Sequence, residues 1–215
     1  MKKRIYFTGL FFVLFAVWTA VVCLVDRKAI GPLGSVVGLA GINNFFADLI
    51  GVNFALYNLT DLLSVVPIAF ALGFSVLGFT KLIKGKSIKK VDRSLLVLGA
   101  FYAVLGVVYF LFELVVVNFR PVLIDGHLEG SYPSSTTLLV LCVMPTVAFE
   151  LLNRMKGKAF KVIVFLFILA FTVFMVAGRI MAGVHWFSDI VGGALCSCFL
   201  ISGYFTALYG VRLQK

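Results

Sequence analysis

Long apolar runs separated by short polar segments fill this chain, and six of them have the length of membrane-spanning helices. About 20 consecutive apolar residues are needed to cross the roughly 30 Å hydrocarbon core of a bilayer. The runs cover about residues 5–25, 55–82, 95–117, 137–152, 162–177 and 190–209. The pattern therefore predicts an all-α integral membrane protein with six transmembrane helices in a single domain, residues 1–215.

The polar residues next to the first two runs predict additional structure. Residues 26–53 are glycine-rich and only moderately apolar, so we expect a surface segment with one short interfacial helix near residues 41–50. Asn58, Thr60 and Asp61 stand at the start of the second run. They favour a helix N-cap with a favourable helix dipole, although they would also suit the wall of a polar cavity.

Two of the runs carry a feature that bears on how they fold. The first follows MKKR, which is the charge pattern of a signal peptide. It is longer than the usual apolar region of such a peptide and lacks a small-x-small cleavage site, so it predicts an uncleaved first helix. Pro145 lies inside the fourth run, where we expect a kink whose freed carbonyl is satisfied by neighbouring helices.

Composition supports the membrane assignment. The mean hydropathy is +1.11, and 62% of the residues are hydrophobic while only 13% are charged, which exceeds what a soluble interior of this size can hold. A net charge of +10 would indicate nucleic acid in a soluble protein. Here the basic residues fall in short loops, so they describe topology and no nucleic-acid partner is expected. The four cysteines lie inside apolar runs and predict small reduced core residues without a metal site.

The distribution of positive charge predicts the orientation of the chain. With six spans, fifteen of the nineteen Lys and Arg residues fall on one side, in the two termini and in residues 81–93 and 153–161. Cytoplasmic loops carry this excess, so both termini should be cytoplasmic in a multi-pass plasma membrane protein, with residues 118–136 and 178–189 outside. The other side holds only Arg27, Lys28, Arg120 and Arg179. The last two break the charge rule, which suggests that they meet an anion.

The segment GRIMAGVHWFSD, residues 178–189, gathers ionisable groups between two apolar runs. Arg179, His185 and Asp189 are costly to place at a membrane edge unless they are paired or hydrated, so they form a candidate site. If the chain is helical from His185, Asp189 lies on the same face and can hold one imidazole nitrogen. The alternative is a helix N-terminus capped by Ser188 or Asp189, with Arg179 meeting lipid head groups.

Further polar residues on the same predicted face complete a phosphate site. Arg120 and Arg179 can hold phosphate oxygens through bidentate hydrogen bonds. Ser134, with the backbone N–H groups of Ser135 and Thr136 at a helix N-terminus, supplies further donors. A neighbouring imidazole can then attack phosphorus while these donors stabilise the charge that grows on the phosphoryl oxygens.

The ordered set resembles the type 2 phosphatidic acid phosphatases, lipid phosphatases related to the vanadium haloperoxidases. Their three motifs are Lys, six residues, then Arg-Pro; Pro-Ser-Gly-His; and Ser-Arg, five residues, His, three residues, Asp. This chain keeps Arg120-Pro121 of the first motif and Pro133-Ser134 of the second. It matches the third at Arg179, His185 and Asp189.

The resemblance implies a function for most of these residues. His185 would be the nucleophile that forms a phosphohistidine, and Asp189 would orient it. Arg120, Arg179 and Ser134 would hold the phosphate. The family needs neither metal nor organic cofactor. The substrates of the family imply that this protein acts on a membrane lipid. That substrate would be a phospholipid or polyprenyl phosphate, such as phosphatidic acid, phosphatidylglycerophosphate or a polyprenyl diphosphate.

Four positions depart from the family pattern. Gly178 replaces Ser, with the loss of one donor, and Ser135 replaces Gly, which matters only if that position needs a positive φ. Glu113 stands where the family has Lys and reverses a charge next to phosphate. Thr136 stands where the family has the His that protonates the leaving oxygen, and threonine cannot act as a titrating acid.

Two interpretations of these departures remain open. In the first, the enzyme is active with a reassigned acid, either His127 or Glu113, the latter with a pKa raised by desolvation. In the second, hydrolysis is lost or slow, and the pocket binds a lipid phosphate or transfers the phosphoryl group. A structural alternative exists for each residue, because His127 would suit a solvated loop and Glu113 could pair with Arg120.

A transporter or scramblase is the alternative from a different class. Such proteins usually carry discontinuous helices or paired charges at mid-membrane. Here the strong charges lie at the predicted outer ends of spans, apart from Glu113 and Asp61. The sequence therefore favours an active or partly active lipid phosphatase, since a protein that only binds has no need of an oriented nucleophile.

Overall fold

Eight α-helices make up most of residues 1–213, which are the residues that the computed structural model describes. They are α1 Lys2–Leu24, α2 Ala40–Ile50, α3 Phe54–Leu63, α4 Val65–Gly85, α5 Arg93–Leu114, α6 Ser135–Arg154, α7 Lys158–Met181 and α8 Phe187–Leu213, with short 3-10 turns η1 Pro32–Gly34 and η2 Ile88–Lys90. By length and composition, six stretches can cross a membrane, with α3 and α4 counting as one. The predicted all-α fold with six spans is confirmed.

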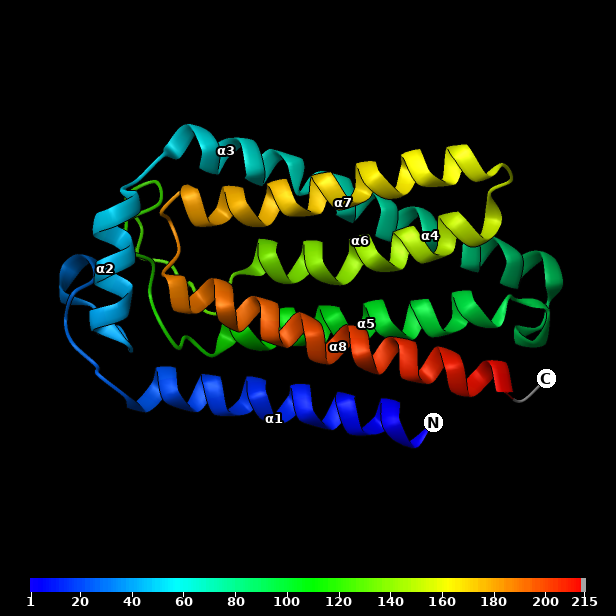
Figure 1. The fold of residues 1–215 in the computed structure, drawn as a ribbon, viewed down its shortest axis with the longest axis horizontal. Coiled ribbons are helices and arrows are strands. Elements are labelled where there is room, and N and C mark those ends of the chain that lie inside the picture. The colour runs from blue at the N-terminus through cyan, green and yellow to red at the C-terminus, as the bar shows by residue number, and fades with distance from the viewer. Residues whose placement is uncertain (214–215) are drawn as a thin grey trace.

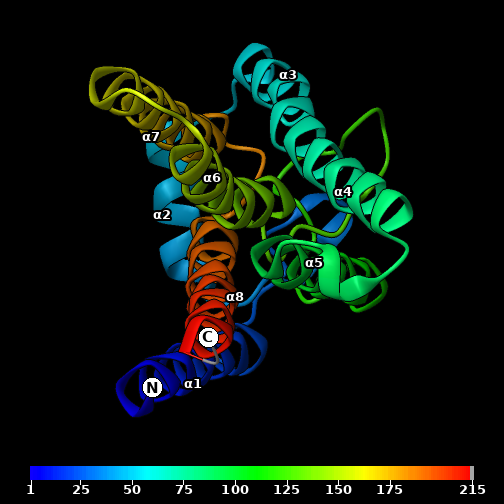
Figure 2. The same cartoon turned by 90° about the vertical axis from the view of Figure 1, so that its right-hand side faces the viewer.

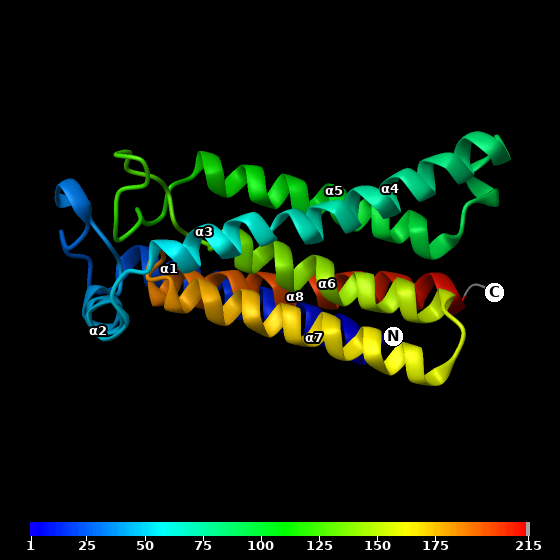
Figure 3. The same cartoon turned by 90° about the horizontal axis from the view of Figure 1, so that it is seen from above.

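The long helices run side by side, and both termini lie at one end of the bundle (Figures 1 and 3). The α4–α5 and α6–α7 connections lie at that same end (Figure 1), and residues 81–93 and 153–161 around them hold ten of the nineteen Lys and Arg residues. The predicted helix after the first span is present as α2, and it lies across the opposite end of the bundle (Figure 1). The cytoplasmic placement of the termini stays a prediction.

Helix α6 lies at the centre of the bundle and packs against α4, α5, α7 and α8 (Figure 2). It passes through Pro145 as one continuous helix. Its buried side chains include Leu138, Val143 and Met144, which form part of the main core cluster. The outer helices instead expose large apolar side chains, such as Phe7 of α1 and Phe167 of α7. A helix that is apolar all round and still exposed is suited to lipid.

The second span begins within one residue of the predicted start, but it differs from the prediction because it is broken into α3 and α4. Asn53 caps α3 by accepting a hydrogen bond from the Leu56 N–H at 3.0 Å. Asn58, Thr60 and Asp61 therefore lie inside a helix, and the N-cap interpretation of them is wrong.

The break between α3 and α4 falls at Ser64, three residues before Pro67. A proline has no N–H to donate to the carbonyl four residues earlier, and its ring crowds that carbonyl. Sharp bends in helices usually have this cause. The break lets α3 lean toward α7, which it contacts, while α4 packs against α5 and α6.

Ion pairs fasten the end of the bundle that carries the termini. Asp92 accepts from Lys81 of α4 at 2.7 Å and from Arg154 of α6 at 3.2 Å. The Lys81 ammonium, and then Arg154, hold the pKa of the Asp92 carboxyl below its usual value. Arg154 also pairs with the buried Glu150 at 2.7 Å. These groups tie three spans together where the chain leaves the apolar region.

Two adjacent glycines of α8 let the segment before α6 pack closely on that helix. A Cβ at Gly192 would lie 2.4 Å from the Tyr132 ring, and one at Gly193 would lie 3.1 Å from the Ser134 carbonyl oxygen. The Tyr132 hydroxyl shares a 2.7 Å hydrogen bond with Thr19 of α1. The glycines thus let the residues directly before the start of α6 lie close against α8.

We expect Gly192→Ala to destabilise the protein. Alanine is favoured over glycine in a helix by about 1 kcal/mol, but a methyl forced against a packed ring costs about 1–3 kcal/mol. Gly203→Ala on the same helix is the matched control, because its Cβ would meet only Thr8 at 3.8 Å. Thermal unfolding in detergent should show a lower midpoint for Gly192→Ala and an equal or higher one for Gly203→Ala. Equal midpoints for both variants would contradict this packing role.

Candidate active site

A polar cavity of about 440 Å³ opens at the end of the bundle where α2 lies. It lies where α3, α5, the start of α6 and the end of α7 meet the α5–α6 and α7–α8 loops. Its lining brings together Arg120, Arg179 and His185, which are far apart in the sequence. The lining residues are Asp61, Tyr109, Phe112, Glu113, Arg120, Glu129, Gly130, Ser131, Tyr132, Pro133, Ser135, Leu138, Arg179 and His185.

His185 reaches this cavity from a tight turn between α7 and α8. Helix α8 begins at Phe187, so the condition that the chain is helical from His185 is not met. The turn passes through Gly183, which has φ +64° and whose Cβ would lie 1.8 Å from the Gly51 carbonyl oxygen. Both the positive φ and the close approach require glycine there.

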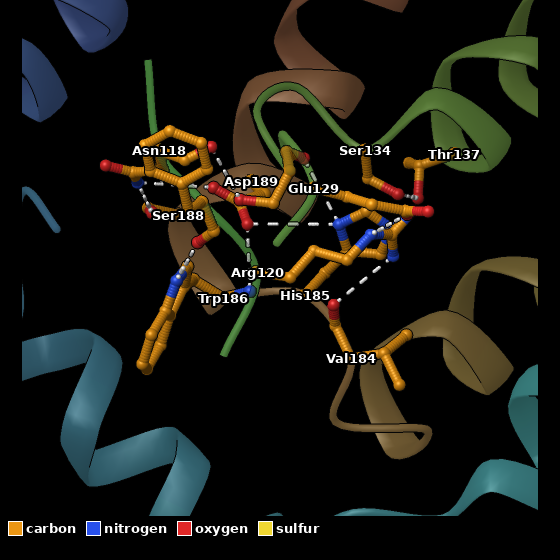
Figure 4. A network of polar contacts seen from close by, with 12 residues as sticks. Asn118, Arg120, Glu129, Ser134, Thr137, Val184, His185, Trp186, Ser188 and Asp189 are labelled. Carbon is orange, nitrogen blue, oxygen red and sulfur yellow. Dashed lines mark hydrogen bonds and ion pairs between the residues drawn. The ribbon is translucent and has the colours of Figure 1, made fainter. Parts of the chain in front are cut away.

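The hydrogen bonds of His185 define its tautomer (Figure 4). Nδ1 lies 3.1 Å from the Ser131 carbonyl oxygen, which can only accept, so Nδ1 carries the proton. Nε2 lies 3.2 Å from Nη1 of Arg120, which can only donate. The lone pair of Nε2 is therefore held beside a guanidinium in the cavity. The Asp189 carboxylate is farther from Nδ1, at 3.9 Å, so the carbonyl is the direct partner of the ring.

Asp189 holds the polypeptide around the imidazole. Its Oδ2 accepts from the Trp186 N–H at 2.9 Å, and its Oδ1 accepts from Nδ2 of Asn118 at 3.3 Å. Its carbonyl oxygen accepts from the Ser134 N–H at 3.0 Å. A carboxylate in the first turn that reaches back to the residue before the helix is a helix cap. The cap interpretation thus holds for Asp189, and the same carboxylate lies beside His185.

Two buried asparagines support this arrangement, and no sequence pattern pointed to them. Asn118 accepts from the Gly38 N–H at 3.0 Å with its carbonyl oxygen while its amide donates to Asp189. Asn43 of α2 accepts from the Ser188 N–H at 3.0 Å and donates to the Ser188 hydroxyl at 2.9 Å. Because buried amides need partners, these bonds fix α2 and the loop after α1 against the start of α8.

Two tryptophans hold the same region through their indole N–H groups, a role that was not predicted for them from the sequence. Trp18 of α1 donates to the Ser188 carbonyl oxygen at 3.1 Å. Trp186 donates to the Phe119 carbonyl oxygen at 2.7 Å. Tryptophan suits a membrane edge because one part of its ring is apolar while its N–H seeks an acceptor. That preference is the sequence signal which could have placed both residues near the site.

Arg179 is 1% exposed, and its guanidinium is incompletely paired. It donates to the Thr60 hydroxyl at 3.3 Å, lies 3.9 Å from the Asp61 carboxylate and stacks 4.9 Å from the centre of the Tyr57 ring. Its Nε has no hydrogen-bond partner among residues 1–213. Gly178 packs against Thr60, where a Cβ would lie 2.7 Å from its methyl. The glycine therefore has a packing role, and the polar-cavity alternative is correct for Asp61.

Arg120 is 8% exposed and pairs with Glu129, whose Oε2 lies 3.0 Å from Nε. The predicted alternative, in which Glu113 pairs with Arg120, is wrong, because Glu129 of the same loop is the carboxylate in contact. Glu113 lines the cavity from the end of α5, together with Tyr109 of the same helix. Neither guanidinium is saturated by these partners, so both can take an anion.

The start of α6 presents one of the three predicted donor residues to the cavity. Ser135 lines it, whereas Ser134 and Thr136 are buried outside the lining. The Ser134 hydroxyl accepts from Thr137 at 3.0 Å. The first N–H groups of a helix lack intrahelical partners and carry partial positive charge. Ser135 has no positive φ, so the replacement of the family glycine there carries no backbone strain.

Of the two candidate acids, only Glu113 lines the cavity. His127 is exposed at the tip of the α5–α6 loop, where its N–H and carbonyl exchange bonds of 2.8 and 3.0 Å with Ile124. Asp125 and Gly126 form the turn with φ values of 48° and 79°. The solvated-loop interpretation fits the position of His127.

The surroundings of His185 keep its imidazole neutral. Burial, followed by the charges of Arg120 and Arg179, lowers the pKa of His185 from its usual 6.5 to about 4, against the opposing effect of Asp189. A lowered pKa disfavours the protonated form, so Nε2 stays available as a nucleophile down to mildly acidic pH. As pH falls from 6.5 toward 4 the unfolded chain takes up this proton first, so folding stability falls over that interval.

Comparisons with known proteins bear on the family and the fold of the chain. A protein-family model described as "PAP2 superfamily" matches residues 95–212. The fold is similar to the crystal structure of a transmembrane PAP2 type phosphatidylglycerolphosphate phosphatase from Bacillus subtilis, with a TM-score of 0.59, 20% identity and 98% of each chain covered. At that identity the likeness shows the fold. A search of curated protein sequences found no match.

We expect His185 to titrate near pH 4 instead of 6.5, for the physical reasons given above. The His127→Gln variant leaves one imidazole, which nitrogen-15 NMR can follow in detergent. The spectrum should show the Nδ1–H tautomer at neutral pH. Adding Arg120→Gln should raise the midpoint, since it removes a positive charge 3.2 Å away. A midpoint near 6.5 that does not respond to Arg120→Gln would refute the neutral, guanidinium-paired ring.

Proposed function

The chain belongs to the PAP2 superfamily, as its motifs indicated, and on that premise we propose that it is a membrane lipid phosphatase. It would hydrolyse a phosphate monoester or a diphosphate of a lipid on the extracytoplasmic face, through a phosphohistidine. One observation carries the proposal. The unprotonated Nε2 of His185 is held beside Arg120 in a polar cavity at the end of an apolar bundle.

In the first step the phosphoryl group would lie between Arg120 and Arg179. Nε2 of His185 attacks phosphorus, so that an N–P bond forms while the P–O bond to the leaving group breaks. The Ser131 carbonyl oxygen keeps the proton on Nδ1 and stabilises the positive charge that the ring gains. The two guanidiniums and the N–H groups at the start of α6 stabilise the phosphoryl oxygens. In the second step water attacks phosphorus, which releases phosphate and frees the imidazole.

The leaving oxygen would receive its proton from Glu113. Glu113 lines the cavity and His127 does not, so the geometry supports Glu113 as the acid. A diphosphate substrate would lessen this need, because phosphate is a better leaving group than an alkoxide. Arg120 is paired with Glu129, so an entering phosphate would replace a carboxylate there.

A lipid-phosphate-binding protein or a phosphotransferase is the second candidate. The observation that favours it is Thr136, which stands at the family position of the acid but lies outside the cavity lining. A transferase would pass the phosphoryl group from His185 to an alcohol instead of to water. A transporter or scramblase has less support, because the polar cavity occupies one end and α6 fills the centre of the bundle.

We expect His185→Ala to abolish phosphate release. The purified protein would be given phosphatidic acid, phosphatidylglycerophosphate and a polyprenyl diphosphate in detergent. The wild type should also form an acid-labile, base-stable phosphoprotein that His185→Ala does not form. Release that survives His185→Ala would exclude this nucleophile, whereas a phosphoprotein that forms without phosphate release would favour the transferase or binding function.

The two candidate acids can be separated by their variants. Glu113→Gln should lower kcat for a phosphate monoester by about 10²–10⁴-fold, the usual contribution of a general acid. The loss should be smaller for a diphosphate. His127→Ala should leave the rate within about twofold, because the residue lies outside the cavity. The reverse pattern would assign the proton to His127.

A further inference from the structure

Two apolar hollows lie next to the active-site cavity, one after the other, along the face between α4 and α5. The first has a volume of about 290 Å³ and shares Tyr109 and Leu138 with the lining of the active-site cavity. The second has a volume of about 310 Å³ and shares Ser75 and Tyr102 with the first. We call them the near and far hollows. Through these shared walls the three spaces form one line.

The length of this line follows from the geometry of α5. Tyr109, Tyr102 and Leu95 border successive spaces and lie seven residues apart, which is about 10 Å of helix for each interval. The two hollows together therefore extend about 20 Å from the cavity, or about two thirds of the roughly 30 Å hydrocarbon core. Tyr102 stands at their junction, where its hydroxyl shares a 2.9 Å hydrogen bond with Thr146 of α6.

Glycines keep the hollows open. Gly106 lines the near hollow, and Gly78 and Gly99 line the far one. A Cβ built at any of the three would meet nothing within 4 Å. Gly99 and Gly106 are exposed on the surface of the bundle, so both hollows open sideways to lipid. The other walls are almost entirely aliphatic and aromatic, as a hydrocarbon chain requires.

We propose that these hollows hold one hydrocarbon chain of the substrate, and that the far hollow makes the enzyme selective for long chains. This rests on the proposed function. A chain leaving the near end of the line begins at the wall of the cavity that holds the phosphate, which is why we assign the substrate and not a resident lipid. Short chains end near Tyr102 and do not use the far hollow.

The hollows would act by alignment more than by affinity. Lipid tails are as apolar as leucine, so moving a chain from the bilayer into a groove gains little hydrophobic free energy. A chain fixed along α5 nevertheless limits the positions that its phosphate can take. Holding a reacting group in place for attack is worth a large rate factor, and small displacements reduce it. The selectivity is therefore expected in kcat/KM.

Single glycine substitutions test the two hollows separately. Gly99→Phe fills the far hollow and Gly106→Phe fills the near one. Gly73→Phe is the matched control, because Gly73 is exposed on α4, has open space around its Cβ and lines neither hollow. The substrates are octyl phosphate and hexadecyl phosphate at equal mole fraction in detergent micelles.

We expect Gly99→Phe to lower kcat/KM for hexadecyl phosphate at least about tenfold, or about 1.4 kcal/mol. The value of kcat/KM for octyl phosphate should stay within about twofold of the wild type. Gly106→Phe should lower kcat/KM for both substrates, and Gly73→Phe for neither. An equal effect of Gly99→Phe on both chain lengths, or no effect on either, would overturn the chain-length role.

A labelling experiment shows where the hydrocarbon chain binds, even if the protein does not turn over the substrate. Hexadecyl phosphate with a diazirine at its last carbon should label residues 78–99 in the wild type, and Gly99→Phe should move or remove the label. If no substrate releases phosphate, the proposed function fails, but this label still reports where the chain lies. A label on α1 or α7, or equal labelling by a hexadecane diazirine without phosphate, would show that bulk lipid fills the hollows.

Discussion

The buried carboxylate of Asp189 is the group on which the rest of the site depends. It is fully buried in an apolar bundle, so its charge must be met by donors. The Trp186 N–H and the Asn118 amide supply them, and the Asp189 carbonyl oxygen receives the Ser134 N–H. One residue thereby connects the turn that carries His185, the loop that carries Arg120 and the start of α6. The proposed nucleophile and the proposed phosphate donors are therefore positioned by the same set of bonds.

Each of the two buried guanidiniums near this site has a carboxylate counterpart. Arg179 and Arg120 are almost fully buried, and each lies beside a carboxylate, Asp61 at 3.9 Å and Glu129 at 3.0 Å. Unpaired charges at such depth would cost several kcal/mol or more. Carboxylates at the cavity edge therefore stabilise the guanidiniums while no anion is bound. They also weaken the site for phosphate, since an entering anion must replace or approach them.

Sequence patterns predicted the spans and the three motif residues of the site because both signals are local. Apolar runs report membrane depth directly, and the spacing of Arg179, His185 and Asp189 lies within one segment. What the sequence did not reveal depends on contacts between segments. Asn43 and Asn118 gain their importance only when α2 and the α5–α6 loop meet at Ser188. The break at Ser64 and the pairing of Arg120 with Glu129 likewise depend on tertiary packing.

The positions of the hollows and of Glu113 follow one constraint of phosphoryl transfer. In an in-line displacement the leaving oxygen lies opposite the nucleophile. In a lipid phosphate that oxygen is attached to the hydrocarbon chain. If the chain runs along α5 from Tyr109, the leaving oxygen lies on the α5 side of the cavity, away from His185. Glu113 is one helical turn beyond Tyr109 on that same helix, whereas Thr136 is buried at the start of α6. A proton donor on α5 is thus the arrangement that suits a substrate whose chain lies between α4 and α5.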